Sequence, residues 1–305
     1  MSWVIIALIA YIFIGTQTLL DKFLISSERI AHPAIYTFYS GILSLPILLL
    51  APLGFHRIGG TEFFWNIFSG ALFVYGILFL FFALRKNEAS RVVPIVGAVV
   101  PVVTFILSFF VLGSVLKSQQ IIGVILLILG GFLISFETEN GNKKTKKLFS
   151  GFYLSIISGI FFGIAFVIFK KLYLTDNFFN VFLWTRIGLF AGAMTLFLIP
   201  NWRKIIINSF LSAKKAPKKD YQTGFLFVGN KILGGVGSIL LQRAVSIGEV
   251  TIVNALVSIQ YAFIFVVGIF LSLHWPEIFH EKRNKKEIWQ KIFAIAIITV
   301  GIFYI

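Results

Sequence analysis

The chain has 305 residues, of which 58% are hydrophobic and only 13% are charged, and its mean hydropathy is +0.94. Ordinary soluble domains are about 45–50% apolar and about 25% charged, so this composition indicates a chain that folds mainly in lipid. The net charge of +15 does not indicate nucleic-acid binding, because the basic residues lie in short connectors between apolar runs. The chain contains no cysteine, which excludes disulfides, thiolate metal sites and thiol nucleophiles.

Ten apolar runs follow one another along the chain, each close to the length that a helix needs to cross a hydrocarbon core of about 30 Å. They cover residues 2–20, 34–54, 63–84, 92–112, 119–136, 151–169, 178–200, 223–245, 249–273 and 289–305. Their continuous apolarity, without alternation, excludes a transmembrane β-barrel. The first run has no Lys or Arg before it and no small-residue cleavage site, so we expect a retained span rather than a signal peptide. The sequence therefore predicts an all-α membrane protein with ten transmembrane helices.

The two halves of the chain resemble each other. Matching residues recur in the same order: Gly15 and Lys22 as Gly163 and Lys170, Gly76, Ala83 and Glu88 as Gly237, Ala244 and Glu249, and Gln119, Gly130 and Phe132 as Gln290, Gly301 and Phe303. Since an odd number of spans per half places the halves in opposite orientations, this predicts two inverted five-helix repeats. The expected repeats are residues 1–136 and 151–305, joined by a basic connector, 137–150.

Several short motifs make the chain resemble the drug/metabolite transporter superfamily, in its ten-helix branch of EamA-type transporters. These motifs are the Gly15 to Lys22 and Gly163 to Lys170 pairs, the stretch from Ala83 to Ser90, Pro101-Val102, Leu112-Gly113 and Gln119 to Gly123. The resemblance covers essentially the whole chain and implies a small-molecule transporter. Three positions depart from the family pattern, with Ser114 in place of an acidic residue, Ala262 opposite Pro101, and Ser40 opposite Arg186.

The distribution of basic residues predicts the orientation. The odd-numbered connectors hold 20 Lys and Arg residues, whereas the even-numbered connectors hold 5. Cytoplasmic loops of membrane proteins carry the excess of positive charge, so the odd connectors are expected in the cytoplasm and both termini outside. The family resemblance implies the opposite orientation, with both termini in the cytoplasm.

Two basic residues lie deep within predicted spans, each about eight residues from the start of its run. Lys231, which follows Asn230, is predicted to bind a substrate carboxylate or phosphate; the alternative is a Lys that extends toward the interface. Arg186 is the second candidate, and Trp184 beside it leaves open a position nearer the interface. No Asp or Glu lies equally deep, which disfavours cation–proton exchange and favours an anionic, zwitterionic or neutral substrate.

Further polar residues within the spans are candidates to line a central substrate site, although hydrogen bonding between helices explains each of them equally well. They are Asn254, Gln260 and Tyr261 in the ninth run, Gln17 in the first and Tyr75 in the third. Pro94 and Pro101 lie seven residues apart on one face of the fourth run and are candidates for a hinge or kink. The glycines from 229 to 237 follow no strand, so we expect close helix packing rather than a phosphate-binding loop.

The sequence predicts a secondary transporter in the cell membrane, most simply an exporter of a small polar metabolite such as an amino acid. The four His residues are dispersed without metal-ligand spacing and no nucleotide-binding motif is present, so neither metal nor cofactor is expected. Proton coupling and substrate exchange are the candidate driving forces. A lipid-linked sugar flippase of the same superfamily is the first alternative. A membrane-embedded transferase is the second, but it would need paired carboxylates at the headgroup level, and an enzymatic role is not expected.

Overall fold

The computed structural model describes residues 2–25, 32–86, 89–135, 151–213, 220–274 and 285–304. The described residues are almost entirely helical, and no strand occurs among them. The elements are α1 (Ser2–Ile25), α2 (Pro33–Ile42), the 3₁₀ helix η1 (Leu45–Leu53), α3 (Gly60–Lys86), α4 (Ala89–Leu112), α5 (Ser118–Ser135), α6 (Phe152–Tyr173), α7 (Phe178–Met194), the 3₁₀ helix η2 (Thr195–Leu198), α8 (Pro200–Ala213), α9 (Asp220–Ile247), α10 (Val250–Ala255), α11 (Val257–His274) and α12 (Lys285–Phe303). The prediction of an all-helical fold is confirmed.

Seven segments of the described chain are long and apolar enough to cross a membrane. They are residues 3–20, 33–53, 60–86, 95–112, 152–173, 178–198 and 250–268. Two shorter apolar helices, Ser118–Leu133 and Trp289–Phe303, fall below a full spanning length. Helix α9 is outside both sets, and it carries Asn230, Lys231, Gln242 and Arg243 within its apolar stretch. The chain is therefore a multi-pass membrane protein.

Three of the predicted spans are not single α-helices. The second run changes from α2 to η1, where Pro46 has no backbone N–H to continue the α-helical hydrogen bonds. The seventh run ends in η2, just before Pro200. The ninth run is divided at Leu256 into α10 and α11. Apolar composition predicts that a segment lies in lipid but does not specify whether its helix is continuous.

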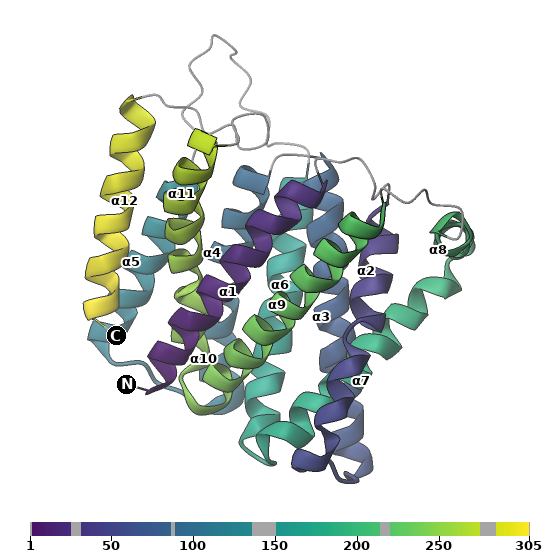
Figure 1. Ribbon diagram of the computed structural model, residues 1–305. Helices are drawn as coiled ribbons and strands as arrows, with labels where there is room; N and C mark the ends of the chain where they lie inside the picture. Colours follow the sequence, from purple (N-terminus) through teal and green to yellow (C-terminus); the bar gives the residue numbers. More distant parts are fainter. Residues whose placement is uncertain are drawn as a thin grey trace.

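The connector predicted at residues 201–222 contains a further helix, α8. Ile206 of α8 is fully buried and belongs to one apolar cluster with Phe38 of α2 and Leu196 of η2. Ser209 is 3.2 Å from the hydroxyl of Tyr39. Helix α8 lies at the edge of the bundle in Figure 1. One face of α8 thus covers α2, while residues such as Arg203 remain exposed, as in helices that lie along a membrane interface. The basic connector expected at 137–150 lies outside the described residues.

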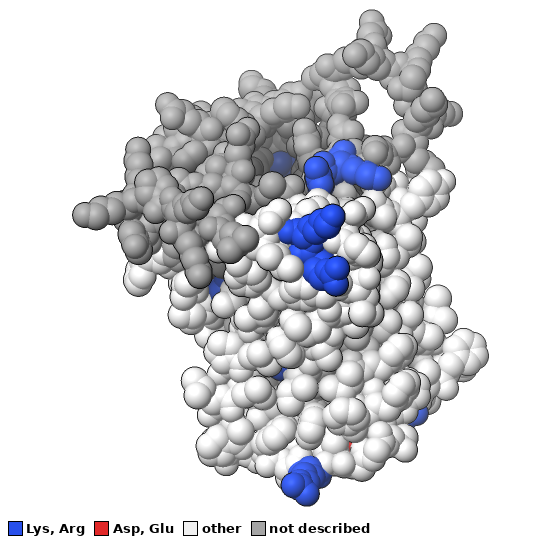
Figure 2. Space-filling view, turned by 90° about the vertical axis from the view of Figure 1, so that its right-hand side faces the viewer, with Lys and Arg blue, Asp and Glu red and all other residues white. Residues whose placement is uncertain are grey.

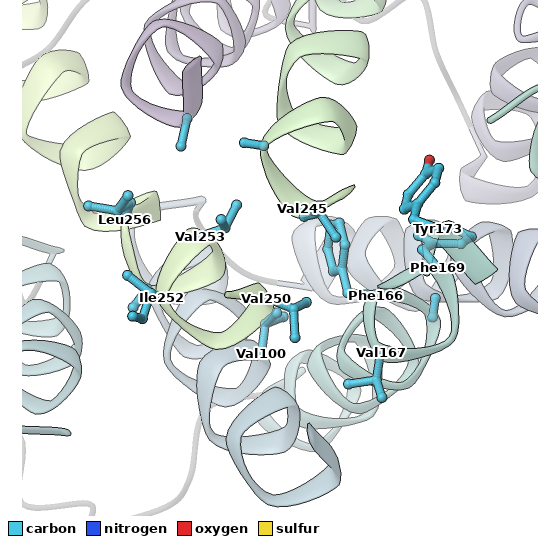
Figure 3. Packing of buried hydrophobic residues seen from close by; sticks show 14 of the residues in the cluster. Val100, Phe166, Val167, Phe169, Tyr173, Val245, Val250, Ile252, Val253 and Leu256 are labelled. Atoms are coloured by element: carbon cyan, nitrogen blue, oxygen red, sulfur yellow. The ribbon is translucent and has the colours of Figure 1, made fainter. Parts of the chain in front are cut away.

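The helices run alongside one another, and both termini lie at the same end of the bundle (Figure 1). The largest apolar core joins residues of both halves of the chain. Figure 3 shows part of this core, to which α4 contributes Val100, α6 Phe169, α9 Val245 and α10 Ile252. On the face seen in Figure 2, the larger areas of Lys and Arg lie toward the upper and lower ends, and the surface between them is almost entirely uncharged.

Helix pairs pack through glycines in both halves. Helix α3 packs along α6, where a Cβ on Gly76 would lie 2.8 Å from the ring of Phe162. Helix α9 packs along α1, where a Cβ on Gly237 would lie 2.9 Å from Ile14. Gly76 and Gly237 are 161 residues apart in sequence. Their partners, Ile14 and Phe162, are 148 residues apart, which is also the separation of the matching pair Gly15 and Gly163.

The same correspondence occurs where α5 packs against α12. A Cβ on Gly130 would lie 2.6 Å from Ile298, and a Cβ on Gly301 would lie 3.2 Å from Leu127. Both glycines and both partners are 171 residues apart in sequence. Close approach of helix backbones at small residues is a common basis of helix association in membranes.

Candidate functional site

A row of small and polar residues follows one face of α9. Lys231, Gly235, Ser238 and Gln242 are spaced by four, three and four residues, so they share one side of the helix. We call these four residues the α9 polar stripe. Ile232 and Val236 lie on another side of α9 and are 64% and 38% exposed, which is the side that faces lipid. At about 1.5 Å per residue, the stripe extends about 16 Å along the helix axis.

The first residue of the stripe contacts α2. The Lys231 ammonium donates a hydrogen bond to the hydroxyl of Tyr36. The Tyr36 ring in turn packs against Phe81 of α3, with 4.2 Å between the ring centroids. Lys231 is partly buried, so its charged end lies between α9 and α2 rather than in solvent.

Ser238 of the stripe contacts the guanidinium of Arg186, which projects from α7. Arg186 Nη2 donates to Ser238 Oγ at 2.8 Å, and the guanidinium carbon lies 4.4 Å from the ring centroid of Phe182. Arg186 is only 8% exposed, and its Nε has no hydrogen-bond partner among the described residues. Within the described part of the chain, Arg186 forms no ion pair with a carboxylate. Arg186 is thus a buried cation whose described neighbours are neutral, and its depth in the membrane stays a prediction.

The last residue of the stripe contacts α6. The hydroxyl of Tyr173 donates to Gln242 Oε1 at 3.2 Å. The Tyr173 ring stacks on Phe178, and Phe178 stacks on Phe182, with centroid distances of 5.5 Å and 5.4 Å. An aromatic column therefore supports the Arg186 side of the stripe.

The glycines of α9 serve two different purposes. A Cβ on Gly234 would overlap the side chain of Gln17, and Gly237 packs against Phe13 and Ile14, so these two positions allow close contact with α1. A Cβ on Gly235 would meet no atom within 4 Å. The expectation of close packing therefore holds for Gly234 and Gly237, whereas open space adjoins the stripe at Gly235, between Lys231 and Ser238.

The other candidate residues are hydrogen-bonded at separate helix contacts. Gln260 donates to Thr18 of α1 at 3.2 Å, Tyr261 donates to the carbonyl of Val93 in α4 at 3.1 Å, and Asn254 donates to the carbonyl of Val250 in its own helix at 2.8 Å. These contacts are distinct from those of the α9 polar stripe, and the role of these residues in binding stays a prediction.

Four further candidates lie outside these contacts. The Tyr75 hydroxyl is 2.5 Å from that of Thr195, and Asn230 is buried beside Lys231. Pro94 and Pro101 lie within α4, which is assigned as one continuous helix. Their role as a hinge stays a prediction.

Four residues of this region were not predicted from the sequence: Tyr36, Tyr173, Ser238 and Gln242. Ser238 and Gln242 had a detectable pattern, because they continue the helical spacing that begins at Lys231. Tyr36 and Tyr173 had none, since each reaches α9 from a helix distant in sequence. Among the described residues, no group of three or more His, Cys, Asp or Glu side chains could hold a metal ion.

Comparison with known proteins identifies the family of this chain. The model of the EamA-like transporter family matches residues 1–136. An uncharacterized protein of Methanocaldococcus jannaschii is 32% identical over 135 residues, which cover 43% of this chain and 95% of that protein. A crystal structure of another protein aligns with 98% of this chain and covers 94% of that protein's chain, with a TM-score of 0.66 and 16% sequence identity. This likeness establishes a shared fold alone. The chain belongs to the EamA-like transporter family, within the drug/metabolite transporter superfamily.

Proposed function

We propose that this protein is a secondary transporter, without enzymatic activity, that exports a small polar metabolite such as an amino acid across the cell membrane. The observation that carries the proposal is the α9 polar stripe. Charged and polar side chains within an apolar bundle are costly unless they have a role, and they commonly mark substrate pathways. Lys231 begins this stripe and Arg186 contacts it at Ser238, with open space at Gly235 between the two positions.

The proposed architecture is ten transmembrane helices in two inverted repeats, 1–136 and 151–305, joined by the connector 137–150. The matched contacts support it. Gly76 meets Phe162 as Gly237 meets Ile14, and Gly130 meets Ile298 as Gly301 meets Leu127. Two copies of one bundle, related by a twofold axis in the membrane plane, would produce these reciprocal contacts. The position of both termini at one end of the bundle also agrees with an even number of spans (Figure 1).

Alternating access is supported by a difference between two equivalent helix–helix contacts, which we call seams. One joins α3 to α7 and the other joins α9 to α2. Gly70 of α3 contacts the backbone of α7 directly, because a Cβ there would lie 2.6 Å from the carbonyl carbon of Gly188. The residue equivalent to Gly70, 161 positions later, is Lys231, which reaches α2 through its side chain. One seam is thus closed by backbone contact and the other is bridged by side chains. Rocking of the two halves against each other would exchange the closed and the side-chain-bridged seam. Proton coupling or substrate exchange would drive this motion.

In this proposal Lys231 and Arg186 bind the substrate, with Asn230 beside Lys231. Asn254, Gln260, Tyr261, Gln17 and Tyr75 contribute polar groups near the bundle centre, and Pro94 and Pro101 allow α4 to bend. The hydrogen bonds of Gln260 to α1 and Tyr261 to α4 are weak enough to be exchanged during a conformational change.

A lipid-linked substrate is the second candidate, and one observation favours it. An apolar groove of about 520 Å³ lies between α3, α4 and α6. Trp65, Phe68 and Val111 line the groove and are exposed, so it opens sideways toward lipid. Glu62 and Lys171 contribute its charged groups near the helix ends. A flippase would hold an acyl chain in such a groove and move the headgroup along the bundle.

Counterflow in proteoliposomes tests the leading proposal. The full chain would be reconstituted and screened with radiolabelled amino acids, nucleotides and sugars, beside Lys231→Ala and, as a matched control, exposed Lys117→Ala. We expect saturable exchange of one substrate class. Lys231→Ala should raise the half-saturation concentration about tenfold or more, because a charge-assisted hydrogen bond contributes about 1.5–3 kcal/mol. The Lys117→Ala variant should match the wild type. Exchange of no small molecule, together with transbilayer movement of fluorescent lipids, would favour the flippase.

A further inference from the structure

Arg186 has an unusual environment for a charged side chain in a membrane protein. It is 8% exposed, projects from the middle of α7 and contacts no carboxylate within the described residues. Its surroundings are neutral: the Ser238 hydroxyl, the Phe182 ring, and the Tyr173 and Gln242 pair nearby. Removal of a guanidinium from water is costly unless an opposite charge replaces the lost hydration.

The hydrogen-bonding capacity of Arg186 is only partly used. A guanidinium has five N–H donors in a planar fork, and one Nη group here donates to Ser238. Nε is buried and has no partner in the part of the chain that the structure describes. The donors of a guanidinium match the paired oxygens of a carboxylate or phosphate, which accept two parallel hydrogen bonds. The remaining donors of Arg186 therefore favour an anionic acceptor at this position.

The neighbouring part of α9 leaves room for such a group. Ser238 shares the stripe with Gly235, where a Cβ would meet no atom within 4 Å. The next cation on this face is Lys231, which begins seven residues before Ser238, or about 10 Å along the helix. An anion that leaves Arg186 along the stripe would therefore move toward a second positive charge.

We propose that the substrate carries an anionic group, a carboxylate or a phosphate, that binds Arg186 and the Ser238 hydroxyl. This inference rests on the proposed function as a transporter and assigns the chemical class of its substrate. Ser238 positions the guanidinium through its hydrogen bond, and the Phe182 ring supports the opposite side. The anion completes the charge and hydrogen-bond balance of Arg186, so substrate binding and burial of this residue depend on each other.

The test compares pairs of probes that differ only in the anionic group. Reconstituted full-length protein would be assayed for counterflow of alanine against alaninamide, and of glycerol 3-phosphate against glycerol. In one pair, we expect the probe that carries the carboxylate or phosphate to be exchanged at least tenfold faster than the partner that lacks it. Arg186→Gln should abolish this preference, Arg186→Lys should retain part of it, and Ser238→Ala should weaken it. Arg243→Gln is the matched control, because Arg243 is exposed and its guanidinium carbon lies 5.3 Å from the Phe178 ring centroid.

A second measurement separates this inference from the transporter proposal. The melting temperature of purified wild type and Arg186→Gln would be measured in phosphate, acetate and chloride at equal ionic strength. Stabilisation by phosphate or acetate that disappears in Arg186→Gln supports the anion site. If the screen then finds no transport, that result contradicts the transporter proposal alone. The anion site would be contradicted if the probes without the carboxylate or phosphate were transported equally well or better, or if the preference were unchanged in Arg186→Gln. Either result would leave the transporter proposal intact. Absence of both transport and anion stabilisation would overturn both.

Discussion

Gly70 of α3 and Gly188 of α7 bring two helix backbones into direct contact. A Cβ on Gly70 would lie 2.6 Å from the carbonyl carbon of Gly188, and a Cβ on Gly188 would lie 2.7 Å from the carbonyl oxygen of Asn66. Backbone atoms cannot move aside as a flexible side chain can. Gly70→Ala should therefore separate the two helices and lower the free energy of unfolding by about 1–3 kcal/mol, as overpacking does.

Thermal unfolding in detergent, followed by tryptophan fluorescence, would measure this effect. Gly229→Ala is the matched control, because a Cβ at Gly229 would meet no atom within 4 Å. An equal melting temperature for the Gly70→Ala and Gly229→Ala proteins would contradict the packing described for this seam.

His32 should make the stability of the α2 end depend on pH. Its Nδ1 accepts a hydrogen bond from the backbone N–H of Ala34 at 3.1 Å, which requires an unprotonated Nδ1. Partial burial, and then the nearby positive charge of Arg85, lower the pKa of His32 below its ordinary value of 6.5. The stabilisation is therefore complete above pH 6.5 and is lost as the pH falls through the lowered pKa of the folded state.

The melting temperature of wild type and His32→Asn would be compared between pH 8 and pH 5. Asn also caps a helix but does not titrate in this range, so the variant should retain more of its stability at the acidic end. The cap itself contributes about 1 kcal/mol, which sets the size of the expected difference. Parallel pH profiles for the two proteins would exclude a role for His32 protonation.

Asn180 should be important for stability at the opposite end of the bundle. It is fully buried, its Oδ1 accepts from the backbone N–H of His56 at 3.0 Å, and its amide group donates to Asp176. Asn180→Ala leaves both partners without this side chain and should cost about 1–3 kcal/mol. Chemical or thermal unfolding beside Asn208→Ala, an exposed position on α8, would measure the difference. A loss as small as that of the control would mean that the two contacts contribute nothing.

The charge distribution predicts which end of the bundle faces the cytoplasm. Single cysteines at Ser2 and Lys215 would report on the two sides, and the native chain contains no other cysteine. With 20 basic residues in the odd connectors and 5 in the even ones, an impermeant maleimide should label Ser2→Cys from outside intact cells. Lys215→Cys should react only after the membrane is permeabilised. Labelling of position 215 in intact cells would reverse the orientation and agree with the topology implied by the family.

Much of the fold was predictable because length and apolarity are properties of a single helix. The runs predicted at 63–84 and 151–169 correspond to α3 (Gly60–Lys86) and α6 (Phe152–Tyr173), with ends displaced by a few residues. The break at Leu256 and the helix α8 were not predicted. Helix α8 depends on a neighbouring segment, because the burial of Ile206 against α2 adds stability to a short amphipathic helix.

The amino-acid sequence was enough to predict a helical membrane protein that resembles the EamA-type transporters, with Lys231 and Arg186 inside apolar runs. Which helix faces each cation could be seen only in the folded protein. The rotation of a helix about its axis depends on contacts between segments far apart in the chain, such as Gly237 with Ile14. These contacts turn Ser238 toward Arg186 and Lys231 toward Tyr36, and neither pairing is encoded in local spacing.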